Sequence, residues 1–303
     1  MATSGRPTAL SALPSPTTPE PLASSLPLAQ RIGHAAPSTF RQLSHVHSGP
    51  GSMSFTSVLN TTALSTNFIF LHRGVIAPHS GIGAHFHHQC EEMFVILDPD
   101  SEAQFTIDGR TSVIKGPVGV PCGMGHSHAI YNHTDKPLQW LNVNVGMSKV
   151  YDAFDLGDSR TEGMVLDKVP QFVTMKLEKT MLQEVPAMDG GRGMVSYRRA
   201  LKPTVFNTTW AWVDHLVVKE GSTVGERAWS DVSEVYVVMD GYGEIWVDGE
   251  CVVVKKDDAV PVDLGQARSI TASGVGPLEF LIIGVAKDME VKRALNAGPP
   301  PST

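Results

Sequence analysis

Short apolar runs of strand length recur along the chain from about Phe55 onwards. They are rich in Val, Ile, Phe and Trp and are separated by Gly, Pro and Asp, as in Phe68–Leu71, Met93–Leu97, Gln104–Ile107, Ser112–Ile114 and Gln139–Val145. Asp108-Gly109 between two such runs is typical of a hairpin turn. No long segment of helical periodicity interrupts them. The pattern predicts an all-β protein, built as a closed barrel or a sandwich.

This apolar and polar pattern occurs twice. The stretch Gly83-x-His85-x-His87-x4-Glu92 aligns with Gly225-x-Arg227-x-Trp229-x4-Glu234 at an offset of 142 residues. Further matches follow at an offset of 140 residues, after a two-residue insertion near Pro99: Asp108 with Asp248, Pro121 with Pro261, His128 with Arg268, and Pro137 with Pro277. We therefore predict two tandem β-modules, residues 50–148 and 203–290, joined by a connecting region at 149–202.

The two ends of the chain lack this pattern. Seven prolines fall within the first 40 residues, and residues 1–45 hold one acidic residue, Glu20. We interpret residues 1–45 as a disordered tail that is dispensable for folding, and residues 291–303 as a second tail. The Ser-rich composition of the first tail also fits an organelle-targeting segment, but its arginines are sparse, so a solvated extension is favoured.

Composition and charge narrow the function classes. The 303 residues are 42% hydrophobic and 18% charged, which suffices for a buried core and excludes wholesale disorder. A net charge of −7 argues against nucleic acid or an anionic membrane as the main partner, and no apolar run is long enough to span a membrane. Three cysteines cannot build a disulfide framework, so we expect a cytoplasmic protein.

Imidazole is concentrated in the first module, because eleven of the twelve histidines lie at or before His133. His85 and His87 are two residues apart in a predicted strand and so share one face. Glu92 opens the next strand, and an antiparallel hairpin would return its carboxylate beside them. His128 on a later strand adds a third imidazole. Such a set suits a divalent first-row metal and leaves two octahedral positions open for catalysis.

At these residues the chain resembles the cupin superfamily, specifically the two-domain bicupins. His85-x-His87-x4-Glu92 fits the first cupin motif, although Pro99-Asp100-Ser101 replaces the glycine that usually ends it. In the second motif, His126 has the expected spacing from Pro121 and His128 has the expected spacing to Asn132. We choose His128 as the third imidazole and keep His126 as the alternative. The resemblance implies double-stranded β-helix (jelly-roll) barrels with a metal held by His85, His87, Glu92 and His128.

The second module has lost this set. Arg227, Trp229 and Arg268 stand where the first module has its three imidazoles, and only Glu234 is kept. Guanidinium groups cannot deprotonate to bind a metal. We therefore expect one divalent transition metal per chain, with Fe or Mn favoured and Zn, Ni or Cu as alternatives. In the second module we expect a Glu234–Arg pair that fills the barrel, with an anion site as the alternative.

Further site candidates come from comparing the two copies. Asn142 replaces the apolar Ile282 of the second module, so we predict that Asn142, and by alternation Asn144, faces the site. The candidates for substrate binding are Arg73, Gln104, Trp140 and Asn142. The candidates for catalysis are Glu92, Tyr131 and His126.

The bicupin resemblance implies a range of functions, which fold does not separate. We favour a metal-dependent oxidoreductase of the dioxygenase type that acts on a small carboxylate or enol-bearing molecule. The alternatives are a decarboxylase, lyase or isomerase at the same site, or a non-catalytic bicupin that binds a small ligand. Since the first module keeps all four metal-binding residues, an enzyme is favoured over a storage protein. A homodimer through barrel edges is the one macromolecular assembly we expect.

Overall fold

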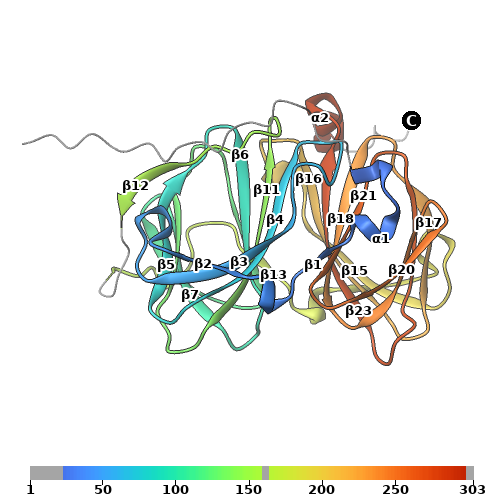
Figure 1. Ribbon diagram of the computed structural model, residues 1–303, viewed down its shortest axis with the longest axis horizontal. Coiled ribbons are helices and arrows are strands. Elements are labelled where there is room, and N and C mark those ends of the chain that lie inside the picture. Colours follow the sequence, from blue (N-terminus) through green and yellow to red (C-terminus); the bar gives the residue numbers. More distant parts are fainter. Residues whose placement is uncertain (1–22, 159–163, 298–303) are drawn as a thin grey trace, which may run out of the picture.

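The computed structural model describes residues 23–158 and 164–297, which form two antiparallel β-barrels side by side (Figure 1). Each barrel pairs a seven-stranded sheet with a smaller one. The strands of the first barrel are β2 (Arg41–Ser44), β3 (Ser52–Leu59), β4 (Phe68–Ile76), β6 (Cys90–Ile96), β9 (Val118–Cys122), β11 (Leu138–Gly146) and β13 (Met175–Lys176), and opposite them β5 (Ser80–Phe86), β7 (Glu102–Ile107), β8 (Arg110–Lys115), β10 (His128–Asn132) and β12 (Phe154–Asp158). The predicted all-β jelly-roll fold is confirmed.

The second barrel repeats the strand order of the first. Its larger sheet holds β1 (Gly33–His34), β14 (Gln183–Pro186), β15 (Met194–Leu201), β16 (Trp210–Val218), β18 (Val232–Asp240), β21 (Asp258–Val262) and β23 (Leu278–Ala286), and its smaller sheet holds β17 (Thr223–Ala228), β19 (Tyr242–Val247), β20 (Glu250–Lys255) and β22 (Ala267–Thr271). The helices are α1 (Leu28–Arg31) and α2 (Met289–Ala297), with single 3-10 turns at Ala23–Ser25, Pro37–Thr39, Val46–Ser48, Lys179–Met181, Met188–Gly190 and Pro203–Val205. Within the part of the chain described, no helix has the length and apolar character that crossing a bilayer requires.

The two seven-stranded sheets pack against each other, so their central strands are buried on both faces. Leu71 and Val143 of the first barrel share one apolar core with Val235 and Ile283 of the second. Strand β23 is buried along its whole length. Strands covered on both sides read as continuous apolar runs. The inner face of each larger sheet then closes a separate lumen, and the first lumen holds the site described below.

The repeat is longer than we predicted. Strands β14 and β15 lie in the predicted connecting region 149–202, yet they extend the second barrel as β2 and β3 extend the first. Strands β12 and β13, from the same region, complete the first barrel. The edge strand β14 is largely exposed and most residues of β15 are half-buried, so their sequences carry little apolar pattern.

The described part of the predicted N-terminal tail, residues 23–45, is ordered, which corrects that prediction. Leu28 is fully buried against the second barrel, and its backbone N–H donates to Glu250 at 2.7 Å. Gly33 pairs with Ala259, so this blue segment lies on the orange second barrel in Figure 1 before it crosses to the first. A few apolar residues suffice for docking on a preformed surface, although they are too few for a periodic pattern. Residues 1–22 lie outside the described residues.

The predicted C-terminal tail, residues 291–303, is also helical in its described part. Helix α2 packs Val291 and Leu295 against Trp212 and Val232. The ammonium of the buried Lys292 donates to the carbonyls of Pro203 and Trp210. These contacts attach the helix to the second barrel. Residues 298–303 lie outside the described residues.

Leu28→Ala should lower the free energy of unfolding by about 2 kcal/mol, because it opens a cavity in a fully buried contact. Urea unfolding followed by tryptophan fluorescence measures this. Leu26→Ala is the matched control, since Leu26 is 43% exposed, and it should change the value by less than about 0.5 kcal/mol. An equal, small effect for both variants would mean that the segment does not pack on the barrel in solution.

Candidate metal centre

Four buried side chains converge in the lumen of the first barrel. His85 lies near the C-terminal end of β5, and His87 follows directly after that strand. Glu92 lies on β6, and His128 is the first residue of β10. Their ligand atoms all lie within 4.8 Å of one another. The Glu92 carboxylate oxygens are 3.9 Å from His85 Nε2, 3.5 Å from His87 Nε2 and 3.5 Å from His128 Nε2. The structure thus brings together the four residues that the sequence proposed.

Each of the three imidazoles is held from behind by a backbone carbonyl. His85 Nδ1 donates to Gly83 O at 2.9 Å, and His128 Nδ1 donates to His126 O at 3.2 Å. His87 Nδ1 donates to the carbonyl of Asp152. A carbonyl can only accept, so Nδ1 keeps its proton and Nε2 is the atom presented to the centre. Backing of this kind fixes the orientation of histidine ligands in metal sites.

Two asparagines of β11 hold the carboxylate. Asn142 Nδ2 donates to Glu92 Oε2 at 3.1 Å, and Asn144 Nδ2 donates to Oε1 at 3.1 Å. Both amides reach Glu92 because β11 pairs with β6, with Asn144 opposite Glu92 and Asn142 opposite Phe94. The polar replacement seen between the two modules therefore marks residues that support the site.

Glu92 and His87 shift each other's pKa. Burial alone would raise the pKa of Glu92, but the charge of His87 and the adjacent imidazole rings of His128 and His85 outweigh it and hold that pKa well below its usual range. For His87, burial acts to lower the pKa, and the Glu92 carboxylate outweighs it and raises the pKa to about 11. Burial lowers the pKa of His85. The carboxylate is therefore ionised, and His87 holds a proton when no metal competes for it.

The donor set fits a divalent transition metal. Within the described residues, the buried Nε2 atoms of His87 and His128 have no hydrogen-bond partner, although they point at the same carboxylate. Three imidazole nitrogens and one carboxylate are ligands that first-row metals prefer. The arrangement leaves unpaired nitrogen atoms where a metal would pair them, which is costly in a purely structural core.

Metal affinity should rise by about tenfold per pH unit between about pH 6 and pH 8. The reason is the proton on His87, whose pKa of about 11 lies above this range, so the proton must leave when the metal binds. Competition with a chelating dye at several pH values gives the slope. Calorimetry in two buffers of different ionisation enthalpy counts the released proton independently. An affinity that does not change with pH would contradict this assignment.

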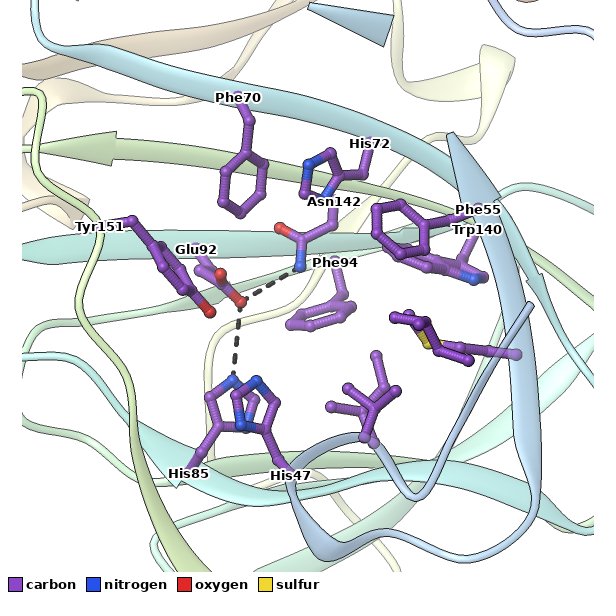
Figure 2. Close-up of a pocket in the computed structure, with 14 residues that line it drawn as sticks. His47, Phe55, Phe70, His72, His85, Glu92, Phe94, Trp140, Asn142 and Tyr151 are labelled. Carbon is purple, nitrogen blue, oxygen red and sulfur yellow. Dashed lines mark hydrogen bonds and ion pairs between the residues drawn. The ribbon is translucent and has the colours of Figure 1, made fainter. Parts of the chain in front are cut away.

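A cavity of about 280 Å³ opens directly beside the metal group (Figure 2). His85 and Glu92 form part of its wall, and in the figure Asn142 lies between Glu92 and the side chains of Phe55 and Trp140. The remaining wall is mostly apolar or aromatic, formed by Leu43, Val46, His47, Met53, Phe55, Phe70, His72, Ile82, Phe94, Trp140 and Tyr151. A small molecule in this cavity would lie within reach of the open side of the group.

Three polar residues of this wall were missed by the sequence analysis: His47, His72 and Tyr151. His72 packs flat on Phe70 with ring centroids 3.8 Å apart, and burial lowers its pKa to about 4, so the ring is neutral. Tyr151 belongs to the segment before β12. The centroid of its ring lies 5.5 Å from that of Phe70 and 5.3 Å from that of His87. Neither belongs to a motif that would single it out in the sequence, although His72 has a polar counterpart in the second barrel, the buried Asp214.

His47 belongs to a segment that closes the cavity, residues 41–48, which we call the N-terminal strap. The His47 ring stacks on the His85 ring with centroids 3.8 Å apart, and His47 Nδ1 contacts the carboxylate of Asp155. The sequence does indicate that the repeat includes this segment, because Gly49 and Gly51 recur as Gly191 and Gly193 at the same offset of 142 residues. Placing residues 1–45 in a tail hid this continuation of the repeat.

Four predicted site residues lie elsewhere. Arg73 alternates with His72 on β4, so it faces the second barrel and donates to Asp257 at 2.9 Å. Gln104 and Tyr131 lie opposite each other on β7 and β10, on the outer face of their sheet, because Phe105 and Ile130 fill the lumen. None of these three lines the cavity.

His126, the alternative third imidazole, also lies outside. It is in a turn before β10, with Nδ1 at 2.6 Å from Asp108 Oδ2 near the barrel surface. This contact fixes His126 to the hairpin at Asp108 and leaves His128 as the residue in the lumen. By contrast, Trp140 and Asn142 both line the cavity.

The lumen of the second barrel is filled by a charged network. Arg227 lies 3.3 Å from the Glu234 carboxylate, and Tyr236 donates to the same carboxylate at 2.6 Å. Arg268 does not reach Glu234; it donates to the Tyr236 hydroxyl at 2.5 Å and to Asp189 at 2.9 Å. Asp189 occupies the position that corresponds to His47 in the repeat. The predicted Glu234–Arg pair thus involves Arg227 directly and Arg268 through Tyr236.

No family model and no curated protein matches the sequence. Solved structures do match it: oxalate decarboxylase from Bacillus subtilis, in a structure described for its Mn(II) centres, is 17% identical, with 83% of this chain and 76% of that chain covered and a TM-score of 0.58. A mutant of salicylate 1,2-dioxygenase from Pseudoaminobacter salicylatoxidans, in complex with gentisate, is 15% identical over 78% of this chain and 73% of that chain, with a TM-score of 0.55. Vicilin from hazelnut, Corylus avellana, is 12% identical over 84% of this chain and 86% of that chain, with a TM-score of 0.57. These likenesses show that the chain has the all-β jelly-roll fold of cupin proteins.

Proposed function

We propose that this protein is a bicupin enzyme whose first barrel uses a bound divalent transition metal to act on a small oxygen-bearing molecule. The observation that carries the proposal is the juxtaposition of the buried group of three histidines and Glu92 with a cavity of about 280 Å³. A structural metal site is closed by protein ligands, whereas a catalytic one keeps positions open to a substrate. We favour oxidoreductase chemistry of the dioxygenase type, with dioxygen as the second substrate.

Iron or manganese is the favoured metal, and Zn, Ni and Cu are the alternatives. Three imidazoles and one carboxylate form a mixed nitrogen and oxygen set, which does not select for the soft metals that thiolates prefer. The similar oxalate decarboxylase is described with Mn(II) centres, which supports manganese here.

The residues around the group have separable roles. When bound, a divalent metal would supply a Lewis acid with open positions for substrate oxygens and dioxygen. His85, His87 and His128 would hold it through Nε2. Asn142 and Asn144 keep the Glu92 carboxylate in place, and Glu92 is also the candidate base if one of its oxygens is freed. The rings of Phe55, Phe94 and Trp140 keep the cavity poor in water, which strengthens polar interactions at its metal end.

Two groups of alternatives share this site. A decarboxylase, lyase or isomerase would use the same ligands without consuming dioxygen. A non-catalytic binding protein is the other alternative, and vicilin has the same fold. The first barrel keeps all four metal-binding residues together with their supporting hydrogen bonds, and this favours catalysis over storage.

We further propose that the second barrel is the structural half of the bicupin. Arg227 and Arg268 stand in place of imidazoles, and their charges are balanced by Glu234 and Asp189. The larger sheet of the second barrel covers that of the first, which would otherwise expose an apolar face. A cytoplasmic location and a homodimer through barrel edges stay predictions.

The test combines metal reconstitution with gas measurements. Protein purified without added metal is loaded with Fe²⁺ or Mn²⁺ and given a panel of small carboxylates and enol-bearing molecules. We expect dioxygen uptake, measured with an oxygen electrode, for at least one substrate, and none for the His128→Ala variant. Carbon dioxide release without dioxygen uptake would replace the proposal by a decarboxylase. Binding of panel members without any turnover would identify a ligand-binding protein.

A further inference from the structure

In the described part of the chain, no permanently charged cation lines the cavity beside the metal group. Among the described residues that line it, none is a lysine or an arginine. Arg73, a substrate-binding candidate from the sequence, faces the other barrel and is paired with Asp257. Any charge that a ligand brings into the cavity must therefore be balanced by the metal group itself.

The metal group can balance one negative charge. A divalent ion with three neutral imidazoles and the Glu92 carboxylate keeps a net charge of +1. A chelating ligand with a single negative charge would make the centre neutral. A dicarboxylate would leave one charge uncompensated inside a largely apolar cavity, which is strongly unfavourable.

Aromatic rings line the cavity without a break from the metal group outwards. The Phe94 ring lies 6.0 Å from His128 and 5.9 Å from Trp140, and Trp140 lies 6.5 Å from Phe55. Figure 2 shows Phe94, Trp140 and Phe55 on the same side of Glu92. Aromatic pairs prefer offset or edge-to-face contacts, so a ligand ring in the cavity can pack against these side chains in the same way.

The size of the cavity and an unpaired polar atom in its wall also fit an aromatic ligand. An engineered cavity of about 150 Å³ holds benzene, so the present cavity of about 280 Å³ accommodates a ring together with a chelating group. Within the described residues, Asn142 Oδ1 is buried without a hydrogen-bond partner, although Nδ2 of the same amide is bound to Glu92. This oxygen can accept a hydrogen bond from an N–H or O–H of a ligand that lies beside Glu92.

We propose that the cavity selects a planar aromatic molecule with one two-oxygen chelating group that carries a single negative charge, and rejects small dicarboxylates. This inference rests on the metal site of the proposed function and specifies its substrate class. The metal group would bind the chelating oxygens of the ligand, and Asn142 Oδ1 would accept a hydrogen bond from a donor beside them. The aromatic side chains of the wall would pack against the ring.

Hydroxamates test the inference, because benzohydroxamate and acetohydroxamate share one chelating group and differ by a phenyl in place of a methyl. Their affinities for the Mn²⁺-loaded protein, and that of oxalate, are measured by calorimetry and divided by the affinity of each probe for free Mn²⁺. Benzohydroxamate should bind at least about tenfold more tightly than acetohydroxamate, since a buried phenyl adds apolar contact. Oxalate should give the lowest ratio, and the metal-free protein should bind none of them.

A variant locates the ring. Phe55→Ala should remove most of the advantage of benzohydroxamate and leave the acetohydroxamate affinity and the metal content unchanged. Phe154→Ala is the control, because Phe154 is 43% exposed on β12 and does not line the cavity. The comparison of the three probes on the unaltered protein stands even if Phe55→Ala does not fold.

The outcomes separate this inference from the proposed function. A normalised preference for oxalate, or equal binding of the two hydroxamates, would overturn the substrate class while the metal site stands. Failure to take up metal would overturn both. Preference for the aromatic probe without turnover of any aromatic chelator would support the substrate class and contradict catalysis.

Discussion

His87→Ala is expected to bind Mn²⁺ or Fe²⁺ more weakly than the unaltered protein by a factor that exceeds the roughly 10–100-fold cost of losing a supporting residue. His87 is fully buried, its Nε2 lies 3.5 Å from Glu92, and its other ring nitrogen is held by the Asp152 carbonyl. Removing the imidazole ring therefore removes a metal ligand, and it also removes a partner of the buried Glu92 carboxylate. Calorimetric titration and elemental analysis after dialysis measure the loss.

His88→Ala is the matched control for this variant, because the neighbouring side chain is exposed and points away from the lumen. It should bind metal as the unaltered protein does. Trp229→Ala, at the equivalent position of the second barrel, should also leave the metal content unchanged. If His87→Ala retained full metal content, the histidine group would not be the metal site.

Arg268→Ala should lower the free energy of unfolding by about 3 kcal/mol, because it removes a buried guanidinium whose partners are the part-exposed Asp189 and the buried Tyr236 hydroxyl. Arg268 is 2% exposed and donates to Asp189, to the Gly225 carbonyl and to the Tyr236 hydroxyl. Urea unfolding gives the loss of stability. The folded variant should still bind one metal ion per chain, since the first barrel is untouched.

Arg110→Ala is the comparison for this second variant. Arg110 pairs with Asp167 at the surface, and exposed pairs contribute little to stability, so no measurable change is expected. Unchanged stability of Arg268→Ala, combined with weaker binding of an anionic ligand, would show that the arginines of the second barrel form an anion site. The structural role proposed for that barrel would then be wrong.

Local sequence patterns predicted the parts of the site that depend on strand geometry. His85 and His87 share a face because side chains alternate along a strand, and Glu92 returns beside them because one hairpin joins β5 to β6. The comparison of the two modules indicated that Asn142 faces the site, and alternation along the strand added Asn144; both amides donate to Glu92.

The remaining parts depend on packing that alternation does not reveal. The face of β4 that lines the lumen cannot be read from its sequence, because both faces are buried, one in the barrel and one against the other barrel. Arg73 was therefore assigned to the face that His72 occupies. The N-terminal strap escaped detection for another reason: residues 41–44 are exposed and lack an apolar pattern, and only their pairing with β3 brings His47 over the cavity.

The most direct test of a metal-dependent first barrel is anomalous X-ray scattering from crystals grown with Mn²⁺. The account predicts one anomalous peak per chain, between the Nε2 atoms of His85, His87 and His128 and the carboxylate of Glu92, and no peak beside Glu234 in the second barrel. Absence of a peak at the first position, or peaks of equal height in both barrels, would contradict it.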